Sequence, residues 1–430
     1  MNHLKKTISL PQIIALYTAA VLGSGILIVP GLSAQIAGPA SLIAWAIMAI
    51  FSLPMAITMG WLSAKYPHAG GVAHFVSLAY GEQAGIYIGW FFVMSVMIGA
   101  PVAALTGAGY LSSAMGWGET GRFLSGAAMI LGALILNYRG MELGGKIQVA
   151  IVGSILIVLL LSIAGAIPFV EARHFIPFMP NGWFRIGEAA SILFWCFIGW
   201  EAVTHLSEEF ANPKRDSVIG VISAALIVGV IYFLTAFVTV GTDSYTHADT
   251  AIAFLMRFTF GQSGQLLTAI LCFLICGATV IAYTGAASRL AFALGRAGHA
   301  PSFLSRLSSW QTPAGGLTLL AVGFTLAFAF YSTGVISLAK LLLLPNASFI
   351  LTYAGGCAAA IKLFKHSKWQ QLISILSLLL TVCILLFVGW ALLYPLFITI
   401  LVTLYRLWKK KKHSLCPKHK IFRRDSDSIL

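Results

Sequence analysis

Apolar positions fill long stretches of this chain, and polar positions gather in the short segments between them. A helix of about 20 apolar residues is long enough to cross the hydrocarbon core of a bilayer. Turn residues such as Gly38-Pro39 and Tyr66-Pro67 separate successive stretches. The pattern predicts twelve membrane-spanning helices, at residues 11–34, 40–62, 84–112, 121–137, 146–170, 187–208, 217–240, 264–295, 316–332, 335–361, 369–387 and 389–408.

Glycines interrupt the first and the sixth predicted span near their middle. The first contains Gly23-Ser24-Gly25-Ile26, and the sixth contains Phe197-Ile198-Gly199-Trp200-Glu201. Glycine in a helix costs about 1 kcal/mol relative to alanine, and in lipid the freed backbone groups need partners. At either place, an alternative is that glycine only permits close helix packing. Because both interrupted spans open a run of five, and the two runs cross the membrane in opposite directions, the pattern predicts an inverted five-plus-five repeat.

Composition agrees with a membrane protein. Hydrophobic residues make up 59% of the chain and charged residues 9%, whereas a soluble domain carries about 25% charged residues. This composition excludes a water-soluble globule and a disordered chain. We expect an all-α integral membrane protein, with a twelve-helix transporter domain at residues 1–408 and a basic cytoplasmic tail at residues 409–430. Five of the six cysteines lie in apolar stretches and are expected to be core residues.

The placement of positive charge predicts the orientation. Nine of the 27 lysines and arginines lie between Arg406 and Arg424, directly after the last predicted span. Such a segment is typical of an anchor on anionic lipid, so the net charge of +14 does not indicate a nucleic-acid partner. With the N-terminus inside, 22 positive residues lie in the cytoplasm and five outside. We therefore expect both termini in the cytoplasm. A cleaved signal peptide is the alternative for residues 11–34, but no hydrophilic domain follows them.

The two breaks predict a binding site for an α-amino acid. Free N–H groups at Ser24, Gly25 and Ile26 would begin the second half of the first span and attract a carboxylate. Free carbonyls near Phe194, Trp195 and Phe197 would end the first half of the sixth span and accept hydrogen bonds from an ammonium group. A site with these two ends is complementary to a zwitterion.

One acidic residue, Glu201, lies near the middle of a predicted span. A charge at that depth costs at least about 2.5 kcal/mol, so we expect a gating or proton-coupling role. The alternative is a protonated side chain that caps unwound backbone. His205 lies four residues further on the same helix face and could relay protons or simply line the cavity. Trp195, one turn before the break, could close over the substrate or serve only in packing.

The sequence gives little support for a metal site, a sodium site or an enzyme active site. Cys272 and Cys276 share a helix face, but two thiols without further ligands are a poor metal site. Hydroxyls of Thr279, Thr284 and Ser288 could bind sodium, although such hydroxyls usually bond their own helix. A phosphate-binding loop and a catalytic triad are both absent from the sequence. We expect no cofactor, no metal and no enzymatic activity. No lysine or arginine lies near the middle of a span, which favours neutral amino acids.

The chain resembles the amino acid–polyamine–organocation transporters. The residues that carry the resemblance are Gly23-Ser24-Gly25-Ile26 with Pro30; Tyr66-Pro67-His68-Ala69-Gly70-Gly71 with Gly81 and Gly89-Trp90; Phe197-Ile198-Gly199-Trp200-Glu201 with Glu209, Asn212-Pro213 and Arg215-Asp216; and Ser288-Arg289 with Arg296, Gly298 and Pro301. Together these motifs cover residues 15 to about 315. The resemblance implies a carrier with alternating access, with the substrate carboxylate on Ser24 and Gly25, an aromatic gate at Trp195 and a conformational role for Glu201.

The amino-acid sequences of two segments are similar to those of a branch of that family that exports methionine and branched-chain amino acids. These segments are Gly70-Gly71-Val72-Ala73-His74-Phe75-Val76 and Phe194-Trp195-Cys196-Phe197. Proton-coupled relatives carry a lysine midway along helix five, whereas residues 147–160 contain none here. The hypothesis is therefore a secondary carrier for methionine, leucine, isoleucine and valine in a bacterial inner membrane, acting outward, with protons as a possible coupling ion. An uptake permease or exchanger is the main alternative, and a channel or membrane enzyme a minor one.

Overall fold

The computed structural model describes residues 9–66, 71–140, 145–200 and 212–415. These residues form α-helices joined by short 3₁₀ turns, and no strand occurs among them. The α-helices are, in chain order, α1 (Leu10–Val21), α2 (Gly25–Ala37), α3 (Ser41–Lys65), α4 (Gly71–Tyr80), α5 (Glu82–Met115), α6 (Gly118–Tyr138), α7 (Gly145–Ala166), α8 (Trp183–Leu193), α9 (Pro213–Gly241), α10 (Ala251–Arg296), α11 (Ala314–Ser332), α12 (Leu338–Leu363), α13 (Lys368–Leu385) and α14 (Leu393–Leu415). The all-α prediction is confirmed for this part of the chain.

Nine helical stretches within the described ranges are long and apolar enough to cross a membrane. The first, Gly25–Lys65, has 41 residues because α2, the 3₁₀ turn η1 (Gly38–Ala40) and α3 follow one another directly. A straight helix of that length would measure about 60 Å, roughly twice the hydrocarbon core. Gly38, with φ of +63°, turns the chain before Pro39, so the stretch divides into two helices. This is the helix content of a multi-pass membrane protein.

Five of the twelve predicted spans lie wholly within one helix of the described residues. Residues 84–112, 121–137 and 316–332 fall inside α5, α6 and α11. Three features differ from the sequence prediction. The helix α4 lies where the sequence predicts a loop, α10 begins well before residue 264 and kinks at Gly261, and α14 runs on to Leu415 instead of ending at 408. The first residues of the basic tail therefore continue the last helix.

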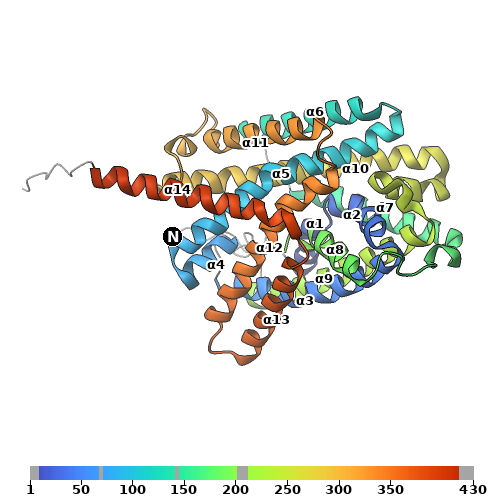
Figure 1. Ribbon diagram of the computed structural model, residues 1–430, viewed down its shortest axis with the longest axis horizontal. Coiled ribbons are helices and arrows are strands. Elements are labelled where there is room, and N and C mark those ends of the chain that lie inside the picture. Colours follow the sequence, from blue (N-terminus) through green and yellow to red (C-terminus); the bar gives the residue numbers. More distant parts are fainter. Residues whose placement is uncertain (1–8, 67–70, 141–144, 201–211, 416–430) are drawn as a thin grey trace, which may run out of the picture.

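Two groups of long helices surround the broken ones. The helices α5 and α10 lie side by side, with α6 and α11 along them (Figure 1). Close approach of α5 and α10 depends on Gly107, because a Cβ there would lie 2.7 Å from Cys276 Cβ. On the other side, α3 packs along α9, and α1 packs on α9 as well. The helix α2 packs against α8, which brings the two interrupted segments together.

Candidate functional site

The first break lies between α1 and α2. The helix α1 ends at Val21, Leu22 has a non-helical ψ of 64°, and α2 begins at Gly25 with Ser24 before it. The Gly23 N–H bonds back to Val21 O at 2.7 Å, which closes a tight turn and ends the helical ladder. The break predicted at Gly23-Ser24-Gly25 is therefore confirmed. The N–H groups at the start of α2 have no acceptor within their own helix.

Two buried tyrosines satisfy carbonyls beside this break. The Tyr232 hydroxyl, on α9, donates to Val21 O at 2.8 Å, where a continuous helix would have used the N–H of Gly25. The Tyr110 hydroxyl, on α5, donates to Leu27 O at 2.6 Å. Both tyrosines are fully buried. Each hydroxyl therefore adds a hydrogen bond to a carbonyl of the interrupted span and attaches that span to a neighbouring helix.

The second break follows α8. After Leu193 the helix tightens into the 3₁₀ turn η4 (Phe194–Phe197), and the chain is extended at Ile198, with ψ of 146°. Gly199 then takes φ of +127°, a region that glycine adopts readily. The helix therefore ends at the predicted interruption. Residues 201–211, which include the predicted coupling residues Glu201 and His205, lie outside the described part of the chain.

Side chains of α12 hold the second break. The Asn346 side-chain amide donates to Ser191 O, a carbonyl of the last turn of α8. The Tyr353 hydroxyl accepts the N–H of Gly199 at 3.2 Å. These bonds replace backbone partners that the ordinary helix would have supplied. The broken segment is thus held by a helix distant in sequence.

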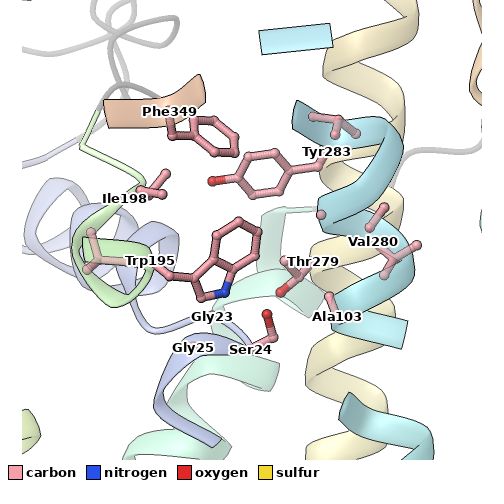
Figure 2. A pocket seen from close by; sticks show the side chains of 14 residues that line it. Gly23, Ser24, Gly25, Ala103, Trp195, Ile198, Thr279, Val280, Tyr283 and Phe349 are labelled. Atoms are coloured by element: carbon pink, nitrogen blue, oxygen red, sulfur yellow. The ribbon is translucent and has the colours of Figure 1, made fainter. Parts of the chain in front are cut away.

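A cavity lies where the two breaks meet (Figure 2). The cavity is lined by residues of the first break, of η4 and its end, and of α5, α10 and α12: Val21, Gly23, Ser24, Gly25, Val96, Gly99, Ala100, Ala103, Trp195, Ile198, Thr279, Val280, Tyr283 and Phe349. None of these lining residues carries a formal charge.

Three polar side chains lie at one end of the cavity, and the Tyr283 hydroxyl lies apart from them, toward Ile198 (Figure 2). In Figure 2, the hydroxyls of Ser24 and Thr279 and the indole nitrogen of Trp195 lie close together beside Gly23. Thr279 Oγ1 donates to Ile275 O at 3.1 Å, which leaves its lone pairs to accept a hydrogen bond. The first N–H groups of α2 lie at this same end. It can therefore bind a small group that both accepts and donates hydrogen bonds.

Aromatic rings form another wall. Trp195 meets Phe349 edge to face, with ring centroids 6.0 Å apart and an interplanar angle of 70°. Phe349 also meets Tyr283 at 6.4 Å, and Phe92 packs on both. Edge-to-face and offset-stacked contacts are the preferred arrangements of aromatic side chains. The rings that line the cavity come from η4, α10 and α12, and Phe92 of α5 packs on two of them.

The sequence-predicted site residues divide into two groups. Gly23, Ser24, Gly25 and Trp195 line the cavity. The other four are not among its lining residues. Ile26 is fully buried, Phe194 packs edge to face on Tyr353, Phe197 packs on Tyr232 and Trp45, and Gly199 bonds Tyr353. These four residues pack next to the two breaks without lining the cavity.

Sequence reasoning missed the wall that α5 contributes. Val96, Gly99, Ala100 and Ala103 all line the cavity, and their spacing places them on one helix face. A run of small residues at helical spacing was the available signal, but it is equally typical of helix packing. Val280, Tyr283 and Phe349 carried no local signal. Among the described residues, no group of three or more histidines, cysteines or acids could hold a metal ion.

Comparison with known proteins identifies the family to which the chain belongs. The family model described as amino acid permease matches residues 8–408. The chain belongs to the amino acid permease family. It is 37% identical over 401 residues to the uncharacterized amino acid permease YecA of Bacillus subtilis (strain 168), covering 92% of this chain and 94% of YecA. It is 31% identical over 419 residues to the L-methionine/branched-chain amino acid exporter YjeH of Escherichia coli (strain K12), covering 96% and 98%.

More distant relatives differ in their named substrates. The branched-chain amino acid permease BcaP of Bacillus subtilis (strain 168) is 25% identical over 337 residues, 71% of this chain and 70% of BcaP. The resemblance to amino acid–polyamine–organocation transporters is thus confirmed at the level of the family. This permease is a multi-pass membrane protein of an amino acid transport family.

Proposed function

We propose that this permease is a secondary carrier that exports neutral, mainly apolar α-amino acids, with methionine, leucine, isoleucine and valine as substrates. The observation that carries the proposal is the cavity between the two helix breaks. It has a helix N-terminus and hydroxyls at one end, and its described lining is mainly apolar and carries no formal charge. The name of YjeH supports the substrate group and the outward direction.

The proposal includes the full architecture. Twelve spans form two inverted repeats of five plus two further helices, in the inner membrane of a bacterium, with both termini in the cytoplasm. Nine long apolar stretches in the described ranges support this count, and α1 with α2 and α8 with its continuation would supply interrupted spans. Anionic lipid would contact the basic residues after Trp408.

Each end of the substrate has proposed partners. The carboxylate binds the N–H groups that begin α2, at Ser24 and Gly25, where the helix dipole favours negative charge. The ammonium group binds carbonyls of η4, near Phe194, Trp195 and Phe197. Trp195 closes over the bound amino acid. Glu201 and His205, which lie outside the described residues, couple the movement to protons.

The side chain of the substrate lies along α5. Val96, Ala100 and Ala103 are buried small or medium apolar residues facing the cavity, and they leave room for a branched or thioether side chain. Each buried methylene contributes about 0.8 kcal/mol, so leucine and methionine bind better than alanine. A lysine or arginine substrate would place its charge on this apolar wall, which is unfavourable without an acidic partner. Transport itself then needs no chemical step.

An uptake permease or exchanger of the same fold is the second candidate. The name of BcaP, a branched-chain amino acid permease, favours it for the same substrate class. Direction depends on coupling and gradients, and the pocket chemistry is the same for both.

Counterflow in proteoliposomes tests the proposal. Vesicles loaded with unlabelled methionine or leucine should accumulate the labelled amino acid in a saturable manner, while arginine and lysine should not compete. A proton gradient that drives net outward flux would support export, and net inward flux would favour uptake. Equal competition by arginine and leucine, or no exchange by folded protein, would overturn the proposed substrate class.

A further inference from the structure

The indole of Trp195 lies in a slot between two glycines. A Cβ on Gly25, in α2, would be 3.0 Å from Trp195 Cδ1, and a Cβ on Gly99, in α5, would be 2.9 Å from Trp195 Cη2. These two carbon atoms are at opposite ends of the indole. Contacts below 3.0 Å are essentially never seen for a real Cβ, and 3.0 Å is already tight. The ring therefore spans the distance from α2 to α5, and neither end leaves room for a methyl group.

The third side of the slot is Phe349, which meets the indole edge to face. With both ends and one face fixed, the indole has little freedom to turn. Within the described residues, no hydrogen bond joins its N–H to another group, and Figure 2 shows the nitrogen turned toward the oxygens of Ser24 and Thr279. The slot thus directs a hydrogen-bond donor into the polar end of the cavity.

We propose that Gly99 is a positioning residue that seats the Trp195 indole so that its N–H donates to the substrate carboxylate. This inference rests on the proposed function, because it adds a further contact between the protein and the proposed amino acid substrate. It also assigns Trp195 a second task besides closing the cavity. Hydrogen bonds to a charged acceptor are about twice as strong as neutral ones, so the donor matters for affinity.

The direction of the effect follows from the geometry. In Gly99→Ala, the new methyl group meets the rigid end of an aromatic ring, which can only move as a whole. The ring then tilts away from α5, and the N–H leaves the polar end of the cavity. The half-saturation concentration for leucine should rise about tenfold, because a lost hydrogen bond to a charged group has at least that effect.

Three variants test the mechanism by leucine counterflow. Trp195→Phe keeps an aromatic ring but has no N–H, and a phenyl ring is too short to reach Gly99. We expect Gly99→Ala to weaken leucine binding about tenfold in the wild-type background and to have almost no further effect in the Trp195→Phe background. Gly132→Ala is the matched control, since a Cβ there meets nothing within 4 Å in the interior of α6. It should behave as wild type.

The carboxylate contact has a separate readout. Leucinol has the side chain and amine of leucine but no carboxylate, so its competition measures the rest of the site. Trp195→Phe should reduce the preference for leucine over leucinol about tenfold, and this measurement stands even if Gly99→Ala fails to fold. An unchanged preference would overturn the inference, and so would an equal effect of Gly99→Ala in both backgrounds. If wild-type protein exchanges no amino acid, the proposed function itself fails.

Discussion

The same substitution at two buried tyrosines should change stability in opposite directions. Tyr17 and Tyr232 are both fully buried, in α1 and α9. The Tyr232 hydroxyl donates to Val21 O at 2.8 Å, at the break between α1 and α2. The Tyr17 hydroxyl has no hydrogen-bond partner among the described residues. A change to phenylalanine removes one oxygen atom from each and leaves the ring in place.

The magnitudes follow from what remains after the change. Tyr232→Phe removes the hydroxyl donor from the Val21 carbonyl, which keeps only its bond from the Gly23 N–H, and the loss of one such hydrogen bond costs about 0.5–1.5 kcal/mol. Tyr17→Phe removes a hydroxyl that burial has already separated from water, so it should be neutral or stabilise the protein by up to about 1 kcal/mol. The expected difference between the two variants is therefore about 0.5–2.5 kcal/mol.

Equilibrium unfolding in detergent micelles, followed by circular dichroism, measures the comparison directly. Both variants should be purified in the same micelles and unfolded in parallel with wild type. If Tyr17→Phe destabilises the protein as much as Tyr232→Phe, the hydrogen-bond assignment at the helix break is wrong. A Tyr232→Phe protein as stable as wild type would contradict it too.

Three further predictions concern transport. Gly25→Ala should abolish leucine counterflow in folded protein, because its Cβ would lie 3.1 Å from the backbone Cα of Cys196, which cannot rotate away; normal counterflow would refute the close approach. Glu201→Gln should slow proton-linked flux, and an unchanged pH dependence of transport would remove this residue from coupling. Truncation after Trp408 should leave the half-saturation concentration for leucine unchanged, and a large shift would give the basic segment a role in the site.

The helix breaks could be predicted because their cause is local. Gly23, Gly25 and Gly199 lie in otherwise apolar spans, and glycine weakens a helix wherever it occurs. The structure ends α1 and η4 at these places. The kink of α10 at Gly261 escaped prediction although its cause is also local, because the predicted span began at residue 264 and left this glycine in the connecting segment.

The wall of the cavity could not be predicted, because its cause is tertiary. Gly99 reads as one more small residue in an apolar helix, and its meaning appears only when Trp195 lies against it. Phe349 likewise belongs to the site only because α12 passes the end of η4. Hydropathy predicts which segments are helices, but in lipid the contacts between them depend on shape. Half of the site therefore had no sequence signature that differs from ordinary helix packing.

The two halves of the first interrupted span are attached to different neighbours. Tyr232 joins the end of α1 to α9 through Val21 O, and Tyr110 joins α2 to α5 through Leu27 O. Between these two bonds, Leu22, Gly23 and Ser24 lie outside both helices, and Leu22 has a non-helical ψ of 64°. A bend at this point would leave both hydrogen bonds intact. Because the substrate carboxylate is proposed to bind at that same point, binding and bending would act on the same few backbone groups, as alternating access requires.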